Sequence, residues 1–250
     1  MSTPEPTPQP TAKAGALPAL LRWPGYLAWA FLTLTVLAVF TVRAGQWQQG
    51  LMLYAVACLA SLLVLAWYAV AVLLPRNGSR RGAIAVRALP ALPGALLLVS
   101  AMAARDVPPI HDITTDLEDP PRFEAVAAAR GPGANSLELD PAVQAQQAKA
   151  YPDLDTLYSS APYGETFARA EAIARELGWE VLRSDRNAGF IEAVDTTAVM
   201  AFKDDVVIRV RSDEDGSRVD LRSASRVGVS DLGANAARIR AFAERFRDGA

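Results

Sequence analysis

Cysteine and histidine are almost missing from this sequence, which has one of each among 250 residues. Because Cys58 has no second cysteine to pair with, an intramolecular disulfide is impossible, and its place in an apolar run predicts packing in a core or against lipid. A net charge of only −2 gives no electrostatic argument for nucleic acid or acidic substrates as partners. The sequence also has no G-x-S-x-G motif, so nothing in it marks the nucleophile of a serine hydrolase.

Charge is scarce in one part of the chain and plentiful in the other. The stretch from Pro24 to Ala104 has only a handful of charged residues, whereas nearly all the acidic residues lie beyond Arg105. Apolar residues make up 51% of the chain, and the mean hydropathy is high for a purely soluble protein. The sequence therefore predicts a membrane region followed by a polar region.

Three apolar runs occupy residues 23–104. A helix needs about 20 apolar residues to cross the roughly 30 Å hydrocarbon layer, because every backbone amide there must be bonded internally. Residues 24–42 and 50–75 meet this requirement, whereas 83–104 is weaker because it contains Arg87 and two prolines. We expect three transmembrane helices, with the Arg87 side chain reaching the headgroups. The alternative is that the third run lies in the interface, which would place the polar region on the other side of the membrane.

Basic residues predict how the chain is oriented. Residues 1–22 are rich in proline and threonine and indicate a disordered tail. This tail carries Lys13 and Arg22, and the loop after the first run has only Arg43. The second loop is more basic and contains Arg76, Arg80 and Arg81, with Arg87 close by. By the positive-inside rule, we expect a multi-pass protein of the bacterial inner membrane with a cytoplasmic N-terminus and a periplasmic C-terminal domain.

The polar region is predicted to form an extended linker or wrapping segment over residues 105–150 and an α+β domain over 151–250. Apolar residues at helical spacing predict a helix over 164–178 and another that starts near Ser230 or Asp231. Four strands lie between them, and the second can continue into residues 198–202; the strands are 179–185, 189–197, 205–212 and 218–225. This order predicts an antiparallel sheet with two helices packed on one face.

Three stretches of this region resemble a known family. "IHDITTDLEDPPRF", "FKDDVVIRV" and "VDLRSASRVGVSDLGANAARIRAF" are similar to the bacterial domain-of-unknown-function family 1499, and the resemblance runs from Pro108 to the C-terminus. The resemblance implies a fold and a location in the bacterial envelope, but no established activity. The chain has "YPDLDTLYSS" where some members have an Asn-Cys-Val-Ser-type segment, so no role of that cysteine carries over.

His111 and the acidic residues after it form the first candidate site. His111, Asp112 and Asp116, with Glu118, could bind a cation such as calcium, or His111 could act as a catalytic base. The spacing fits neither an EF-hand nor a zinc motif. The alternative is that His111 and Asp112 dock the extended segment onto the domain through hydrogen bonds. We therefore assign no catalytic residue and no metal, and we expect no cofactor.

The second candidate site lies just before the last helix. Arg222 and Arg226 flank Ser223 and Ser225, and Ser230 lies at the helix start, where free amides and the helix dipole favour an anion. These residues could bind a phosphate, a carboxylate or a lipid headgroup. The alternative is a structural charge network and helix cap, formed with Asp204, Asp205, Asp220 and Asp231.

Two functions follow from these observations. We favour a non-enzymatic membrane protein whose exported domain binds an envelope protein, a lipid or an anionic ligand. The alternative is a hydrolytic or metal-dependent enzyme that uses His111, the nearby aspartates and the cluster of Arg222 and Arg226. A single concave pocket that gathers these side chains would favour the enzyme, whereas salt-bridged arginines on a flat face would favour the binding protein.

Overall fold

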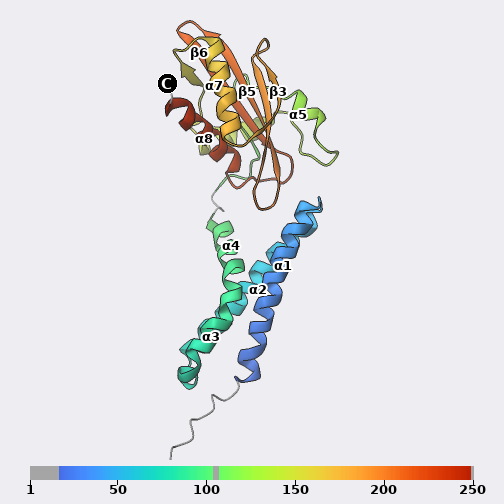
Figure 1. Cartoon of the computed structure of the whole chain (residues 1–250), viewed down its shortest axis with the longest axis vertical. Helices are drawn as coiled ribbons and strands as arrows, with labels where there is room; N and C mark the ends of the chain where they lie inside the picture. The colour runs from blue at the N-terminus through green and yellow to red at the C-terminus, as the bar shows by residue number, and fades with distance from the viewer. Residues whose placement is uncertain (1–16, 104–106, 249–250) are drawn as a thin grey trace, which may run out of the picture. The chain divides into compact units, whose positions relative to one another are not determined.

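A computed structural model of the chain describes residues 17–103 and 107–248. The chain divides between Ser100 and Ala101 into two compact units, which we call the membrane unit and the sheet unit (Figure 1). Most of the predicted disordered tail, residues 1–16, lies outside the described residues.

Three helices of the membrane unit are long and apolar enough to cross a bilayer, which confirms the three predicted runs. α1 (Ala19–Arg43) and α2 (Trp47–Leu73) are continuous, whereas the third, Pro75–Met102, is built from shorter helical pieces. These pieces are η1 (Pro75–Arg80), α3 (Arg81–Ala88), η2 (Leu89–Ala91) and α4 (Leu92–Ala103). Both 3₁₀ pieces contain a proline, which lacks the N–H that a continuous α-helix needs.

Small residues let the helices of the membrane unit approach closely. A Cβ atom on Gly50 would lie 2.5 Å from Cγ2 of Val42, so the turn between α1 and α2 has no room for a side chain. A Cβ atom on Gly94 would lie 2.6 Å from Oγ of Ser61, which brings α4 against α2. Such contacts hold helices together in lipid, where the hydrophobic effect between helices is absent.

The sheet unit contains one antiparallel sheet in the order β1-β6-β5-β4-β3, and a short strand β2 also pairs with β6. The strands are β1 (Asp112–Thr114), β2 (Leu157–Ser159), β3 (Glu180–Asp185), β4 (Phe190–Thr196), β5 (Lys203–Asp213) and β6 (Gly216–Ser225). The helices are α5 (Ala125–Ala128), α6 (Pro141–Ala150), α7 (Tyr163–Glu176) and α8 (Ala234–Asp248).

One face of the sheet packs against α7 and α8, as the sequence predicts (Figure 1). Alternation along β5 turns Val206, Ile208 and Val210 to this face, where they join the apolar stripes of both helices in a single buried core. Trp179 stacks on Phe242 of α8, with ring centroids 5.9 Å apart. The α+β fold class is therefore confirmed.

Two local features differ from the expected pattern. The last helix begins at Ala234 rather than near Ser230 or Asp231, because Leu232 and Gly233 adopt left-handed φ angles of 54° and 86° and interrupt helical geometry. Residues 198–202 form a turn rather than an extension of β4, because the N–H of Thr197 already donates to the carbonyl of Phe202 and closes the chain toward β5.

The opposite face of the sheet is covered by residues 112–130, which we call the covering segment and which precede the central hairpins formed by β3 to β6. Residues 112–114 enter the sheet as β1, and the residues after them cross β5 and β6 and form α5. Because side chains alternate along a strand, this face carries Asp205, Arg209 and Arg211 from β5 together with Asp220 and Arg222 from β6. We call it the polar face.

Candidate functional site

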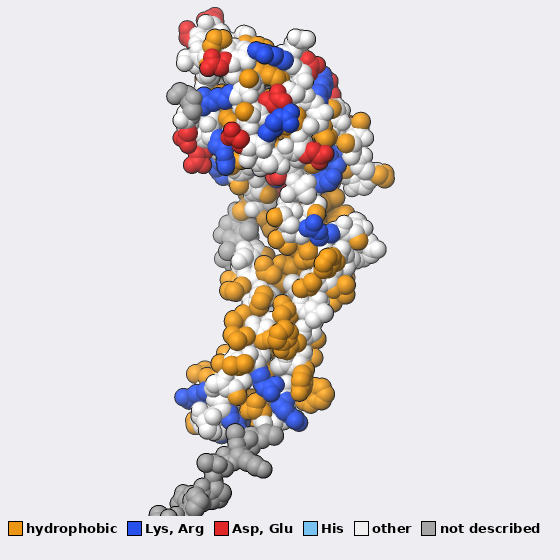
Figure 2. All heavy atoms as spheres, in the orientation of Figure 1, with side chains coloured by type: hydrophobic (Ala, Val, Ile, Leu, Met, Phe, Trp, Pro, Cys, Tyr) orange, Lys and Arg blue, Asp and Glu red, His pale blue; other side chains and the backbone are white. Residues whose placement is uncertain are grey.

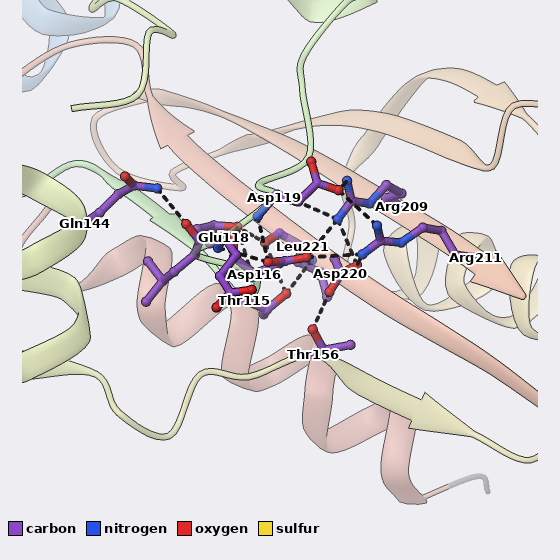
Figure 3. Close-up of polar contacts among 12 residues, drawn as sticks. Thr115, Asp116, Glu118, Asp119, Gln144, Thr156, Arg209, Arg211, Asp220 and Leu221 are labelled. Carbon is purple, nitrogen blue, oxygen red and sulfur yellow. Dashed lines mark hydrogen bonds and ion pairs between the residues drawn. The ribbon is translucent and has the colours of Figure 1, made fainter. Parts of the chain in front are cut away.

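Two arginines of β5 meet three aspartates at the centre of the polar face (Figure 3). The Arg209 guanidinium donates to Asp119 at 2.9 Å and to Asp116 and Asp220 at 3.1 Å. The Arg211 guanidinium reaches the same carboxylates, at 3.0 Å from Asp119, 3.1 Å from Asp116 and 2.7 Å from Asp220. Two of these aspartates precede α5 and one lies on β6, so the arginines clamp the covering segment onto the sheet.

Asp116 also shapes the loop in which it lies. Its Oδ1 atom accepts hydrogen bonds from the backbone N–H groups of Glu118 and Asp119, at 3.1 and 2.9 Å. Partial burial opposes ionisation, but these two N–H groups and the guanidinium groups of Arg211 and Arg209 outweigh it and hold the pKa of Asp116 below its ordinary value. Asp116 is therefore a charged anchor of the loop.

Arg222 makes a second clamp near the edge of the sheet. Its Nε and Nη2 atoms donate to the two carboxylate oxygens of Asp112 at 2.9 and 2.6 Å, a two-pronged geometry that suits the planar guanidinium. Nη2 also donates to the carbonyl of Leu137 at 2.8 Å, and the guanidinium lies over the Phe123 ring. Arg222 is 2% exposed and bonded on every side.

Asp205 is the centre of a third group. Arg226 donates to both of its carboxylate oxygens, with Nη2 at 2.7 Å, and Arg130 donates from Nη1 at 2.8 Å. Burial, opposed by Asp205 and aided by the neighbouring Arg226, lowers the pKa of Arg130. Arg226 also donates to the carbonyl of Ala129, so this group holds the chain just after α5.

The charges of these three groups cancel. We call the groups together the ion-pair lattice; its aspartates are Asp112, Asp116, Asp119, Asp205 and Asp220, and its arginines are Arg130, Arg209, Arg211, Arg222 and Arg226. Five negative and five positive charges sum to zero. An anion that approached Arg222 or Arg226 would have to displace a carboxylate that is already seated, and that carboxylate would then lack its partner.

The serines of the predicted anion site do not lie with its arginines. Ser223 faces α8, where its hydroxyl donates to Oδ1 of Asn235 at 2.7 Å, and the Ser225 hydroxyl accepts from Nδ2 of the same residue at 3.0 Å. Ser230 accepts from the N–H of Leu232. The start of α8 is occupied by Asp231, whose carboxylate accepts the N–H groups of Gly233 and Asn235, both at 2.8 Å. Arg222 and Arg226 therefore bond to aspartates on the polar face, whereas Ser223 and Ser225 face α8.

A cavity of about 200 Å³ lies beside the lattice, between β1 and α6. His111 and Asp112 line it, together with Ser136, Glu138 and Gln147, whereas Asp116, Arg222 and Arg226 do not. The Gln147 side-chain amide is not available to a ligand, because it makes two hydrogen bonds with the Thr114 backbone. It accepts from the N–H at 3.0 Å and donates to the carbonyl at 2.5 Å.

Glu138 and His111 each present an available polar group to this cavity. Within the described part of the chain, the Glu138 carboxylate and Nε2 of His111 have no hydrogen-bond partner, while Nδ1 of His111 lies 3.4 Å from the carbonyl of Val229. No hydrogen bond joins His111 to Ser136 in the described residues, and Asp112 is held by Arg222. The cavity therefore offers a free carboxylate and an imidazole for binding, without the nucleophile-to-base contact that acyl transfer requires.

Over the described residues, no three His, Cys, Asp or Glu side chains come together in a way that could hold a metal ion. Asp112 and Asp116 are instead directed at arginines.

Glu192 and Arg130 make buried contacts that no sequence motif predicts. Glu192 is fully buried, and its carboxylate accepts the N–H groups of Glu124, Ala125 and Val126, which begin α5. Arg130 lies among alanines and glycines without any motif around it. A charged residue inside an apolar strand pattern is the one available hint, and Glu192 in "GFIEAV" fits it.

Comparison with known proteins gives one match. A family model described as "Protein of unknown function (DUF1499)" matches residues 112–246, which is more than half of the chain and includes the whole ion-pair lattice. No curated protein and no solved structure matches the chain.

Proposed function

This chain belongs to the DUF1499 family of proteins of unknown function, and on that premise we propose that it is a membrane-anchored binding module of the bacterial envelope rather than an enzyme. The three apolar helices are the anchor. The sheet unit is the binding part, and the cavity beside β1 is its site. The ligand we propose is a positively charged or hydrogen-bond-donating group of an envelope component.

The main support for this proposal is the ion-pair lattice, whose charges cancel and whose Asp205, Asp220 and Arg222 side chains are buried. Arg222, Arg226, Asp112 and Asp116 are bonded within the chain, so His111 is left without the arginine and aspartate partners that the enzyme alternative requires. The same contacts fix the covering segment, and with it the cavity wall that carries Glu138. A preformed cavity with an unpaired carboxylate suits recognition, because little conformational entropy is lost when a ligand binds.

Charge asymmetry of the membrane unit supports the orientation. Arg22 lies in the first turns of α1, and the contact between Trp67 and Leu20 brings the end of α2 beside it, so Arg76 and its neighbours share that end. Figure 2 shows hydrophobic side chains over most of the visible surface of this unit and basic ones gathered at one of its ends. By the positive-inside rule that end faces the cytoplasm, and the sheet unit is exported to the periplasm of an inner membrane.

Orientation is tested with paired C-terminal reporters, one active only in the cytoplasm and one active only after export. Activity of the exported reporter alone is expected. Activity of the cytoplasmic reporter alone would mean that the third span does not cross, and the envelope assignment would then be abandoned.

The binding site is tested by photo-crosslinking in living bacteria that carry the full-length chain. The crosslinking residue replaces Leu139, which lines the cavity and is 40% exposed, or Leu182 of β3, a matched control that is 41% exposed and outside the cavity. We expect a discrete adduct from position 139 only, and its loss when Glu138→Gln is added. Equal adducts at both positions, or an adduct that ignores Glu138→Gln, would reject the cavity as the site.

A further inference from the structure

A second concave site lies in the membrane unit, apart from the cavity of the sheet unit. It is a groove of about 380 Å³ between the start of α1 and the end of α2. Its wall is mostly apolar and includes Leu20, Trp67, Val70 and Leu74, and Arg76 lines it as the basic residue. The groove thus combines a mostly apolar wall with one cationic side chain.

Direct contacts fix the two walls of this groove. The indole N–H of Trp67 donates to the carbonyl of Leu20 at 3.1 Å, and the buried hydroxyl of Tyr68 donates to the carbonyl of Leu21 at 3.0 Å. Both carbonyls lie in the first turn of α1, so the side chains of α2 hold α1 in place. The groove is therefore preformed rather than created when something enters it.

The position of Arg76 is also defined. The buried Asn77 side chain donates from Nδ2 to the carbonyl of Ala71 at 2.8 Å, and Nε of Arg81 donates to the carbonyl of Val72 at 3.1 Å. These bonds satisfy carbonyl groups at the end of α2 and fold η1 back against the helix. Arg76 is the second residue of η1, and its side chain is exposed.

The described part of this unit carries arginines and no acidic side chains. Residues 17–100 contain no aspartate and no glutamate. Four arginines lie at the end of the unit where the groove is found; they are Arg22, Arg76, Arg80 and Arg81. No acidic side chain of residues 17–100 can pair with these arginines, and in a membrane the phosphate of a lipid headgroup is a source of negative charge.

We propose that this groove binds one anionic phospholipid, with its phosphate at Arg76 and an acyl chain along Trp67, Val70 and Leu74. The apolar wall matches an acyl chain, and Trp67 lies at the level where aromatic residues meet headgroups. A zwitterionic lipid fits less well, because its ammonium group would add positive charge to a site without a carboxylate. This site is independent of the function proposed for the sheet unit, and either proposal can fail alone.

The test uses the full-length chain in nanodiscs that contain phosphatidylethanolamine and a small fraction of fluorescent phosphatidylglycerol. Retention of the labelled lipid is compared for the wild type, Arg76→Gln, and Arg43→Gln as a control that removes one arginine from the other end of α1. A second variant, Val70→Trp, fills the groove and leaves Arg76 intact. Because Arg76 and Val70 are exposed, both variants are expected to fold normally.

We expect Arg76→Gln and Val70→Trp each to lower phosphatidylglycerol retention at least fivefold, with Arg43→Gln unchanged. Labelled phosphatidylethanolamine should be retained weakly by all four proteins. Equal retention of the two lipids, or equal effects of Arg76→Gln and Arg43→Gln, would overturn the proposal. Displacement by soluble glycerol phosphate would also overturn it, because the site would then bind phosphate without the lipid chain.

Discussion

Replacing Arg222 with alanine tests whether buried ion pairs hold the covering segment on the sheet. The change removes both bonds to Asp112, at 2.9 and 2.6 Å, and the bond to the carbonyl of Leu137 at 2.8 Å. It also removes a weaker bond to the carbonyl of Pro121 and the contact of the guanidinium with the Phe123 ring. The Asp112 carboxylate is then left in the interior without its counter-charge.

The expected loss is large relative to the stability of a small domain. Removing one partner of a buried ion pair costs about 3–5 kcal/mol, mainly because the other charge stays buried and unpaired. The Asp112 side chain keeps 12% exposure, so water can partly solvate it, and we expect about 3 kcal/mol. A double-mutant cycle should show this coupling, since Asp112→Ala combined with Arg222→Ala should cost less than the sum of the single changes by about 2 kcal/mol.

Hydrogen exchange of β6 peptides in the detergent-solubilised full-length chain measures this loss as a change in the free energy of opening. Arg240→Ala is the matched control, because Arg240 pairs with Asp153 at 2.7 Å while their side chains are 46% and 52% exposed. An exposed pair contributes less than about 1 kcal/mol. Arg222 does not hold the covering segment on the sheet if Arg222→Ala lowers β6 protection no more than Arg240→Ala, or if the cycle shows no coupling.

Three further predictions concern other parts of the sheet unit. The pKa of Asp116 is lowered from 3.8 in the folded chain, so its stabilisation is present above the ordinary pKa and lost as the pH falls through the folded value. Asp116→Asn should therefore flatten the dependence of unfolding free energy on pH below about pH 4, and an unchanged slope would contradict this. Glu192→Gln should weaken the hydrogen bonds at the start of α5 by about 2 kcal/mol. Hydrogen exchange should therefore become faster in α5 before it changes in β6. Simultaneous loss of protection in α5 and β6 would show that α5 does not open separately. Gly189→Ala should lower stability by more than Gly178→Ala, although both glycines have φ near +80°. The reason is that only at Gly189 would the new Cβ clash with a neighbour, the Val210 carbonyl oxygen at 2.5 Å. Equal melting temperatures of the two variants would contradict this clash.

Much of the fold was predictable because its signals are local. Apolar runs of membrane-spanning length can be recognised from composition alone. The strands of the central hairpins are predicted by the alternation of apolar and polar residues, as at Val206, Ile208 and Val210 of β5. The helix faces follow in the same way from residues three and four positions apart. β1 and β2 were not predicted, because each has three residues and pairs with a strand about 60 to 110 positions away.

The site could be predicted only in part. His111 and Asp112 were singled out by residue type, and both line the cavity. Glu138 was not predicted as a site residue, because an isolated glutamate in a proline- and glycine-rich stretch has the same sequence context as a solvated surface residue. Ser223 and Ser225 were grouped with the arginines next to them in sequence, yet adjacent residues of a strand point to opposite faces.

The sequence by itself determined that this chain has three apolar spans, an antiparallel sheet and two amphipathic helices, because these depend on the spacing of apolar residues over short distances. Only the tertiary structure decided what the charged residues do. Asp112 and Arg222 are 110 positions apart, and nothing local distinguishes an arginine that will meet a carboxylate from one that will stay in water. Pairing across the folded sheet gives Arg222 and Arg226 carboxylate partners in a charge-neutral lattice, and it leaves the Glu138 carboxylate and Nε2 of His111 open at the cavity beside it.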